Sequence, residues 1–275
     1  MKALSGDFFI FKEGEKMKNF KIITSKDNQL IKLAASLQGS ANARKEHNLF
    51  VLEGLRICDD AISSGVIFES LIVSETAYNK YSNSIENFSE FSKECYKIPD
   101  KLFTKISDTM SPQGIIALAK MPQRNTEIKK NGRYIALENI NDPSNLGAIS
   151  RTAEALGVSG IILSKGSVDP YSPKSLRASM GTLLRMPLIV VENFCEDIKN
   201  SGLRVYACVV ERDATSITDV TFTDGTVVMI GNEANGLTEN TKALADSKIT
   251  IKMSGKAESL NASVAAAISI WEMMK

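Results

Sequence analysis

Three polar, glycine-containing segments in the C-terminal half hold residue types that can bind a ligand and do chemistry. The first runs from Asn139 to Ala153, the second from Ile230 to Leu237 and the third from Met253 to Ala267. Their amides, hydroxyls and carboxylates can orient a polar substrate, and their glycines let a ligand approach the backbone closely. A purely structural explanation stands beside this one, because the same residue types cap helices and form tight turns.

The arginine of the first segment is the residue that capping and turn formation leave unexplained. Arg151 lies six residues after Asn145, about one and two-thirds turns of a helix. Its long guanidinium group can point back toward the helix start and bind a phosphate there. We expect Ser144 or Asn145 to cap this helix, and Ser259 to cap the last helix of the chain, with Asn261 in its first turn.

The elements that must position these segments alternate regularly along the C-terminal half. Apolar runs predict buried strands at Tyr134–Leu137, Ile161–Leu163, Leu188–Val191, Val205–Val210, Val227–Ile230 and Ile249–Ile251. Helical spacing and capping residues predict helices at Leu146–Leu156, Lys174–Met180, Phe194–Asn200, Leu237–Ala245 and Leu260–Met274. The alternation predicts a parallel sheet with helices on both faces, where ligands bind at the carboxyl ends of the strands. All three polar segments begin at such strand ends.

The N-terminal half has shorter and more mixed elements. We predict helices at Asn28–Leu37 and Leu55–Ser63, and strands at Phe50–Glu53, Phe68–Val73 and Gly114–Ala119. This pattern is typical of a small α/β domain. The chain is therefore divided into a poorly ordered tail (1–20), a small α/β domain (21–121), a polar linker (122–133) and a second α/β domain (134–275).

Histidine and cysteine usage excludes several classes of enzyme. The single histidine, His47, lies in a polar segment that we interpret as a solvated helix end, so no Ser-His-Asp system is expected. The four cysteines form no CxxC pair, which indicates reduced thiols in a cytoplasmic protein and no metal site. The sequence has no GxGxxG or P-loop motif, and no apolar run approaches the ~20 residues of a membrane span.

The three segments resemble, in order, the three motifs of the SpoU (TrmH) branch of the SPOUT methyltransferases, which methylate the ribose 2′-oxygen of RNA. The matches are N-x-G-A-I-x-R-T-A at Asn145–Ala153, G-N-E-x-x-G-L at Gly231–Leu237 and M-S-G-x-x-E-S-L-N-x-S-V-A at Met253–Ala265. The resemblance implies an α/β fold with a deep trefoil knot, S-adenosylmethionine as cofactor, and a homodimer in which the final helix packs against a partner subunit.

The resemblance also implies the site residues. The catalytic set would be Asn145, Arg151, Glu233, Ser259 and Asn261. The backbone around five residues would contact the cofactor: Ile230, Gly231, Ile251, Leu260 and Ala262. In this family the residue matching Arg151 is proposed as the base, although a guanidinium pKa above ~12 makes a phosphate clamp the physically easier role. Glu233 is the rival base, but its carboxylate could equally hold backbone or asparagine donors.

The N-terminal half is similar to the RNA-binding domain that precedes the catalytic domain in many family members. The similarity rests on Ile23–Ser25, Phe50–Gly54 and Ser111–Ile115. Because the net charge of the 275 residues is only +1, RNA must be bound by a local basic patch. The extra domain favours ribosomal RNA over tRNA as the substrate. A non-catalytic RNA-binding or ribosome assembly factor of the same fold is the alternative from a different class.

Overall fold

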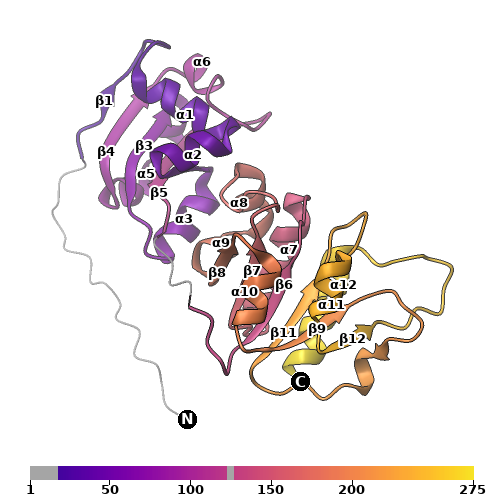
Figure 1. Ribbon diagram of the computed structural model, residues 1–275. Helices are drawn as coiled ribbons and strands as arrows, with labels where there is room; N and C mark the ends of the chain where they lie inside the picture. The colour runs from indigo at the N-terminus through magenta and orange to yellow at the C-terminus, as the bar shows by residue number, and fades with distance from the viewer. Residues whose placement is uncertain (1–17, 123–126) are drawn as a thin grey trace.

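The computed structural model describes residues 18–122 and 127–275 of the chain. Most of the expected N-terminal tail and four residues of the expected linker lie outside these ranges. The described chain forms two sheets, each with its own helices, that lie side by side (Figure 1). The first sheet uses residues between 21 and 120, and the second uses residues between 133 and 250.

The first sheet has five strands in the order β1-β4-β3-β5-β2. Its strands are β1 (Lys21–Ile22), β2 (Leu49–Glu53), β3 (Phe68–Ser74), β4 (Ser92–Ile98) and β5 (Ile115–Lys120). Strands β1, β4 and β3 run parallel, and β5 is antiparallel to both β3 and β2. Its helices are α1 (Gln29–Gly39), α2 (Ala41–His47), α3 (Leu55–Ser63), α4 (Glu75–Lys80), α5 (Ser82–Glu90) and α6 (Asp100–Phe103).

The second sheet has seven strands, all parallel, in the order β10-β12-β9-β11-β6-β7-β8. Its strands are β6 (Arg133–Leu137), β7 (Gly160–Ser164), β8 (Leu188–Val191), β9 (Arg204–Cys208), β10 (Thr215–Ser216), β11 (Thr226–Ile230) and β12 (Ser247–Thr250). Its helices are α7 (Pro143–Ala155), α8 (Pro173–Ser179), α9 (Thr182–Arg185), α10 (Phe194–Asn200), the 3₁₀ turn η1 (Ile217–Asp219), α11 (Glu239–Leu244) and α12 (Ala262–Met274).

Alternate residues of β6, an inner strand, face opposite sides of the second sheet. Ile135 and Leu137 belong to a core that includes residues of α7 and α12, whereas Tyr134 and Ala136 belong to a core with α10. This period of two, with both faces buried, is what a parallel sheet requires. The predicted parallel α/β fold of the C-terminal half is confirmed.

The helix starts differ from the predictions at two of the three polar segments. Asp142, not Ser144 or Asn145, caps α7: its carboxylate accepts the backbone N–H of Ser144 at 2.8 Å. The helix starts earlier than predicted because Pro143 suits the first helical position. Asn261, not Ser259, caps α12, and its Oδ1 accepts the N–H of Ser263 at 2.8 Å.

Strand β4 is the longest strand that the sequence pattern did not predict. Its buried residues are Ser92, Cys95 and Ile98, three apart, so the sequence lacks the alternation that marks a strand. Pairing with β3 on one side and β1 on the other stabilises it instead. Tertiary contacts therefore override the local pattern here.

A continuous apolar core joins the two sheets. It contains Phe50 of β2 and residues of α7 and α9, and the rings of Phe50 and Tyr171 lie 5.3 Å apart. The guanidinium group of Arg44, only 3% exposed, forms an ion pair with Asp169 across the same boundary. The two parts of the chain are therefore packed together rather than joined by the linker alone.

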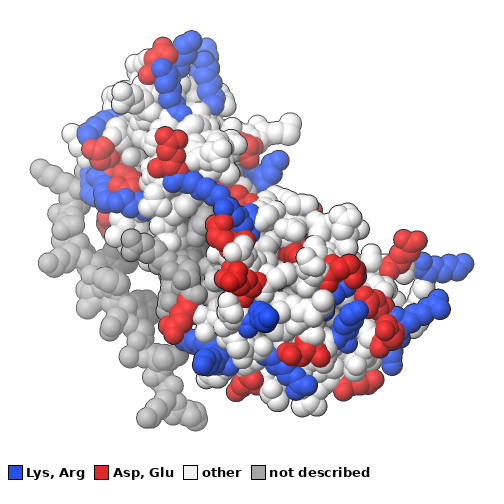
Figure 2. All heavy atoms as spheres, in the orientation of Figure 1, with Lys and Arg blue, Asp and Glu red and all other residues white. Residues whose placement is uncertain are grey.

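On the face shown in Figure 2, Lys and Arg side chains are interspersed with Asp and Glu side chains. None of the helices within residues 18–122 and 127–275 combines the length and apolar character needed to cross a membrane. Nor do the described residues place three or more His, Cys, Asp or Glu side chains where they could hold a metal ion. His47 is exposed and is the last residue of α2.

Candidate active site

The three polar segments come together at the carboxyl ends of β6, β11 and β12. The Glu233 carboxylate, which follows β11, reaches the first segment and accepts three hydrogen bonds from it. Its Oε1 accepts the side-chain amide of Asn145 at 2.8 Å and the backbone N–H of Asp142 at 3.2 Å. Its Oε2 accepts the backbone N–H of Asn141 at 3.2 Å. Glu233 therefore links the second segment to the start of α7.

Asn145 passes the connection on to the third segment. Its Oδ1 accepts a hydrogen bond from Nδ2 of Asn261 at 3.1 Å, and Asn145 itself is only 5% exposed. Asn261 in turn caps α12 through its own Oδ1. The side chains of Glu233, Asn145 and Asn261 thus form one hydrogen-bonded chain across all three segments. We call these three residues the amide chain.

The same contacts set the ionisation of Glu233. Partial desolvation raises the pKa of its carboxyl, but the hydrogen bonds from Asn145 and from backbone N–H groups together outweigh it. The pKa therefore lies below its ordinary value of 4.5, because donors stabilise the charged form. A carboxylate with a lowered pKa and several donors is a weak proton acceptor. Of the two roles that the sequence left open for Glu233, the geometry is that of a carboxylate holding backbone and asparagine donors.

The second segment is a tight loop that admits only glycine at its start. A Cβ on Gly231 would lie 2.1 Å from the backbone of both Gly236 and Leu237. The close approach arises because Asn232 and Gly236 exchange two backbone hydrogen bonds, of 3.1 and 2.9 Å. The Asn232 side chain also donates to the backbone oxygen of Asn139 at 2.7 Å. The loop is therefore closed on itself and fixed to the first segment.

Gly147 of the first segment serves helix packing. A Cβ at this position would lie 2.5 Å from Ala178 of α8, so α7 and α8 can approach closely only over a glycine. The buried hydroxyls of Ser150 and Thr182 meet at 2.7 Å on the same side of α7. Gly147 and Ser150 therefore serve the packing of α7 against α8 and α9.

Arg151, the residue after Ser150 in α7, is exposed. Within residues 18–122 and 127–275 it forms no hydrogen bond or ion pair, whereas Arg44, Arg133, Arg177 and Arg185 all do. An exposed guanidinium group without an internal partner is available to bind an anion. The sequence predicts that Arg151 binds a phosphate, and its N–H donors have no partner among the described residues.

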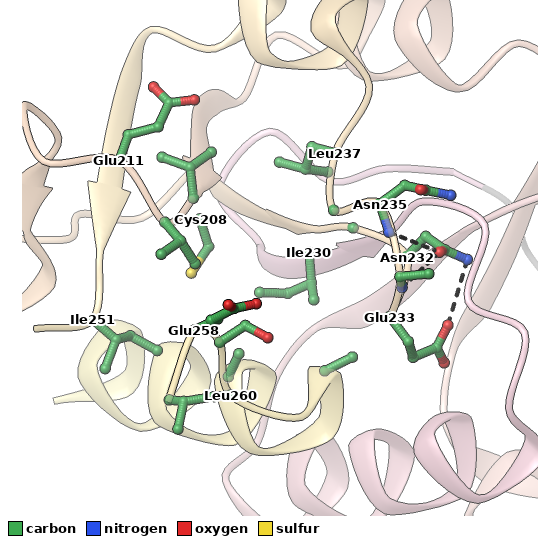
Figure 3. Close-up of a pocket in the computed structure, with 18 of the residues that line it drawn as sticks. Cys208, Glu211, Ile230, Asn232, Glu233, Asn235, Leu237, Ile251, Glu258 and Leu260 are labelled. Carbon is green, nitrogen blue, oxygen red and sulfur yellow. Dashed lines mark hydrogen bonds between the residues drawn. The ribbon is translucent and has the colours of Figure 1, made fainter. Parts of the chain in front are cut away.

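A cavity of about 370 Å³ opens beside the amide chain (Figure 3). Ser259 and Glu233 line it, together with all five residues expected to contact the cofactor: Ile230, Gly231, Ile251, Leu260 and Ala262. Asn145, Arg151 and Asn261 are not among the lining residues. The structure thus gathers the expected cofactor residues in one cavity and leaves three of the five expected catalytic residues outside it.

The cavity also uses residues that the sequence interpretation missed. Cys208, Val209, Val210 and Glu211 line it from the end of β9, and Glu258 lines it from the third segment. The rule that ligands bind at the carboxyl ends of parallel strands applied equally to β9, whose end carries an acidic residue. Glu138 was missed as well: it is 5% exposed and accepts hydrogen bonds from Thr238 and Thr241, which fixes the start of α11.

The sequence of this chain matches models of two protein families and is similar to known rRNA methyltransferases. Residues 132–271 match the sequence model of the SpoU rRNA Methylase family, and residues 28–117 match the MRM3-like substrate binding domain. The 23S rRNA (guanosine(2553)-2′-O)-methyltransferase RlmP of Bacillus subtilis is 27% identical over 92% of this chain and 99% of its own. A 23S rRNA (uridine(2479)-2′-O)-methyltransferase of Streptomyces viridochromogenes is 26% identical over 95% of this chain and 94% of its own.

Solved structures give the same result for the fold. The AdoMet-bound rRNA methyltransferase from Sinorhizobium meliloti superposes with a TM-score of 0.79 and 26% identity, over 92% of this chain and 97% of that one. The family match covers more than half of the chain and includes all three polar segments. The chain therefore belongs to the SpoU rRNA methylase family and is an RNA methyltransferase.

Proposed function

We propose that this enzyme transfers a methyl group from S-adenosylmethionine to a ribose 2′-oxygen of ribosomal RNA. The observation that carries the proposal is the amide chain, which brings three distant segments together beside one cavity. Convergence of this kind is typical of a catalytic site at the carboxyl ends of parallel strands. The activities of the rRNA methyltransferase relatives support the choice of reaction.

The cavity fits the proposed cofactor. Its volume of about 370 Å³ lies within the range of small-molecule sites, and Ile230, Ile251 and Leu260 give it an apolar wall for a purine ring. Gly231 lines the cavity too, at the tight loop that its missing side chain allows. When bound, S-adenosylmethionine supplies an electrophilic methyl group on a sulfonium centre. Backbone around the five lining residues named above would hold it.

Arg151 is proposed to bind an RNA phosphate and so place the ribose. Its guanidinium group is exposed, lacks an internal partner in the described chain, and stays charged at any working pH. A fixed positive charge there stabilises negative charge that develops on the attacking oxygen. We assign removal of the hydroxyl proton neither to Arg151 nor to Glu233, since the first cannot readily accept a proton and the second is held by donors.

Glu233, Asn145 and Asn261 are proposed as positioning residues. Asn145 donates a hydrogen bond to Glu233, and Asn261 donates one to Asn145. These bonds hold the start of α7 and the start of α12 together. They also fix Arg151, which lies on α7, relative to the part of the cavity that α12 lines. Ser259, which lines the cavity, is proposed to contact the ribose or the cofactor.

The N-terminal part, residues 21–121, is proposed to bind the RNA outside the reaction centre. It matches a substrate-binding domain and it packs directly on the methyltransferase part, residues 134–275. Its presence favours ribosomal RNA over tRNA as the substrate. We further propose a homodimer formed through α12, on which Trp271 is 56% exposed and Val264 is 45% exposed.

Transfer of a labelled methyl group to purified rRNA and tRNA, tested separately, decides between the alternatives. We expect label in rRNA only, in a dinucleotide that resists alkali because its 2′-oxygen is blocked. Label in tRNA alone would replace rRNA with tRNA as the substrate. RNA binding without any transfer at millimolar cofactor would make the chain a non-catalytic RNA-binding factor.

A further inference from the structure

The charged side chains around the cavity differ in whether they already have partners. Four of its lining residues carry a charge: Glu211, Glu233, Lys242 and Glu258. Glu211 forms ion pairs with Lys248 at 2.7 Å and with Lys242 at 3.4 Å. Glu233 is held by the amide chain and the backbone. Among these four, only Glu258 forms no hydrogen bond or ion pair with the described residues.

Glu258 is also placed to meet a ligand. It belongs to the irregular segment between β12 and α12, and Ser259 and Leu260, which follow it, line the cavity as well. Figure 3 shows its side chain among Cys208, Ile230 and Leu260, with the carboxylate directed into the cavity. Because Glu258 is exposed and has no partner among the described residues, its carboxylate is available to attract a cation bound in the cavity.

The proposed methyl donor is such a cation, and the reaction removes its charge. As the ribose 2′-oxygen forms a bond to the methyl carbon, the carbon–sulfur bond breaks and its electron pair stays on sulfur. The hydroxyl proton leaves to solvent or to a base. The demethylated cofactor therefore has a neutral thioether at the position where the methyl donor carried a positive sulfonium.

We propose that Glu258 recognises the sulfonium charge and so makes the cavity prefer the methyl donor over the demethylated product, S-adenosylhomocysteine. This inference rests on the proposed function. The preference has a physical basis, since the attraction of a carboxylate for a cation disappears when the cation becomes neutral. Loss of this attraction after transfer also favours release of the product. Glu258 is thus a specificity-determining residue for the cofactor.

The test compares the affinities of two ligands for two variants of the full chain by calorimetric titration. Glu258→Gln keeps the shape of the side chain and removes its charge. We expect it to weaken S-adenosylmethionine binding about tenfold and to change S-adenosylhomocysteine binding less than about twofold. Glu86→Gln on α5 removes the same charge from an exposed site of the N-terminal part and should leave both affinities unchanged.

Two results would overturn the inference. If Glu258→Gln weakens the binding of both ligands equally, the carboxylate contacts the ammonium group that they share. If both affinities are unchanged, Glu258 takes no part in recognition of the cofactor. Failure of the proposed function looks different, because the wild-type chain would then bind neither ligand. Glu258 is exposed, so its replacement should not unfold the chain, and circular dichroism of the variant checks this.

Discussion

Oδ2 of Asp169 accepts a hydrogen bond from Nε of Arg44 at 2.8 Å and forms an ion pair with its Nη2 at 2.7 Å, across the boundary between the two sheets. Arg44 also donates to the backbone oxygens of Leu37 and Gln38, so its charge is surrounded by acceptors. On the other side, the N–H of Val168, next to Asp169, donates to the backbone oxygen of Ile140 at 2.8 Å. The substrate-binding part is thereby connected to the first polar segment.

Removal of the Arg44 charge should therefore destabilise the whole chain. Arg44→Met leaves Asp169 without its partner in a site where Arg44 is only 3% exposed, and we expect a loss of about 3–5 kcal/mol in the free energy of unfolding. Urea denaturation measures it. Lys165→Ala, which breaks the exposed pair of Lys165 and Glu192, is the control and should cost less than about 1 kcal/mol. Equal losses in the two variants would contradict the account.

Replacement of Arg151 should separate catalysis from cofactor binding. Arg151→Ala is expected to lower methyl transfer at least about a hundredfold, because it removes a charged donor from the reacting group, while the affinity for S-adenosylmethionine stays within about twofold. Arg151→Lys keeps the charge but loses the forked geometry, so partial activity is expected. A large loss of cofactor affinity in Arg151→Ala would show that the residue lies at the cofactor instead.

The tight loop of the second segment gives a test with a matched glycine control. Gly231→Ala forces a Cβ to within 2.1 Å of the backbone of Gly236, so the loop must open and cofactor affinity should fall at least about tenfold. Gly255→Ala in the third segment meets no atom within 4 Å and should have little effect. Calorimetric titration of both variants compares them directly. Unchanged binding by Gly231→Ala would mean that the loop does not form the cavity wall.

Glu233 should make the stability of the chain depend on pH in acid. Its folded-state pKa is below the ordinary value of 4.5, so the unfolded chain binds a proton first as pH falls. The stability that Glu233 contributes is therefore fully present above about pH 5 and is lost as pH falls through the lowered pKa. Glu233→Gln should be less stable than wild type at pH 7, and the gap should narrow at pH 3.5. Urea denaturation at both values tests this, and a constant gap would refute it.

The sequence was sufficient for the arrangement of the second sheet because its strands are buried on both faces. Runs such as Val227–Ile230 have no polar residue, and a glycine directly follows this one. The same property placed the three segments at strand ends. Cap positions were less predictable, because several residues near each helix start can cap it. Only the fold decides that Asp142 and Asn261 do so.

Contacts between distant segments lay beyond the sequence pattern. Nothing local distinguishes Arg44 from other arginines in polar helices, yet its partner is 125 residues away. Glu138 directly follows a buried strand, and its burial became visible only with Thr238 and Thr241 beside it. The trefoil knot, the homodimer and the roles of the site residues stay predictions carried by the family resemblance.

The length of chain between Asn145 and Asn261 has a consequence for the synthesis of the enzyme. The two amides that meet at 3.1 Å are 116 residues apart, and the ribosome makes Asn145 first. The hydrogen bond between them can therefore form only after Asn261 has been translated. A nascent chain that has emerged only as far as β9 holds Arg151 but lacks most of the cavity wall, so it cannot methylate RNA. Activity begins only when the last helix is in place.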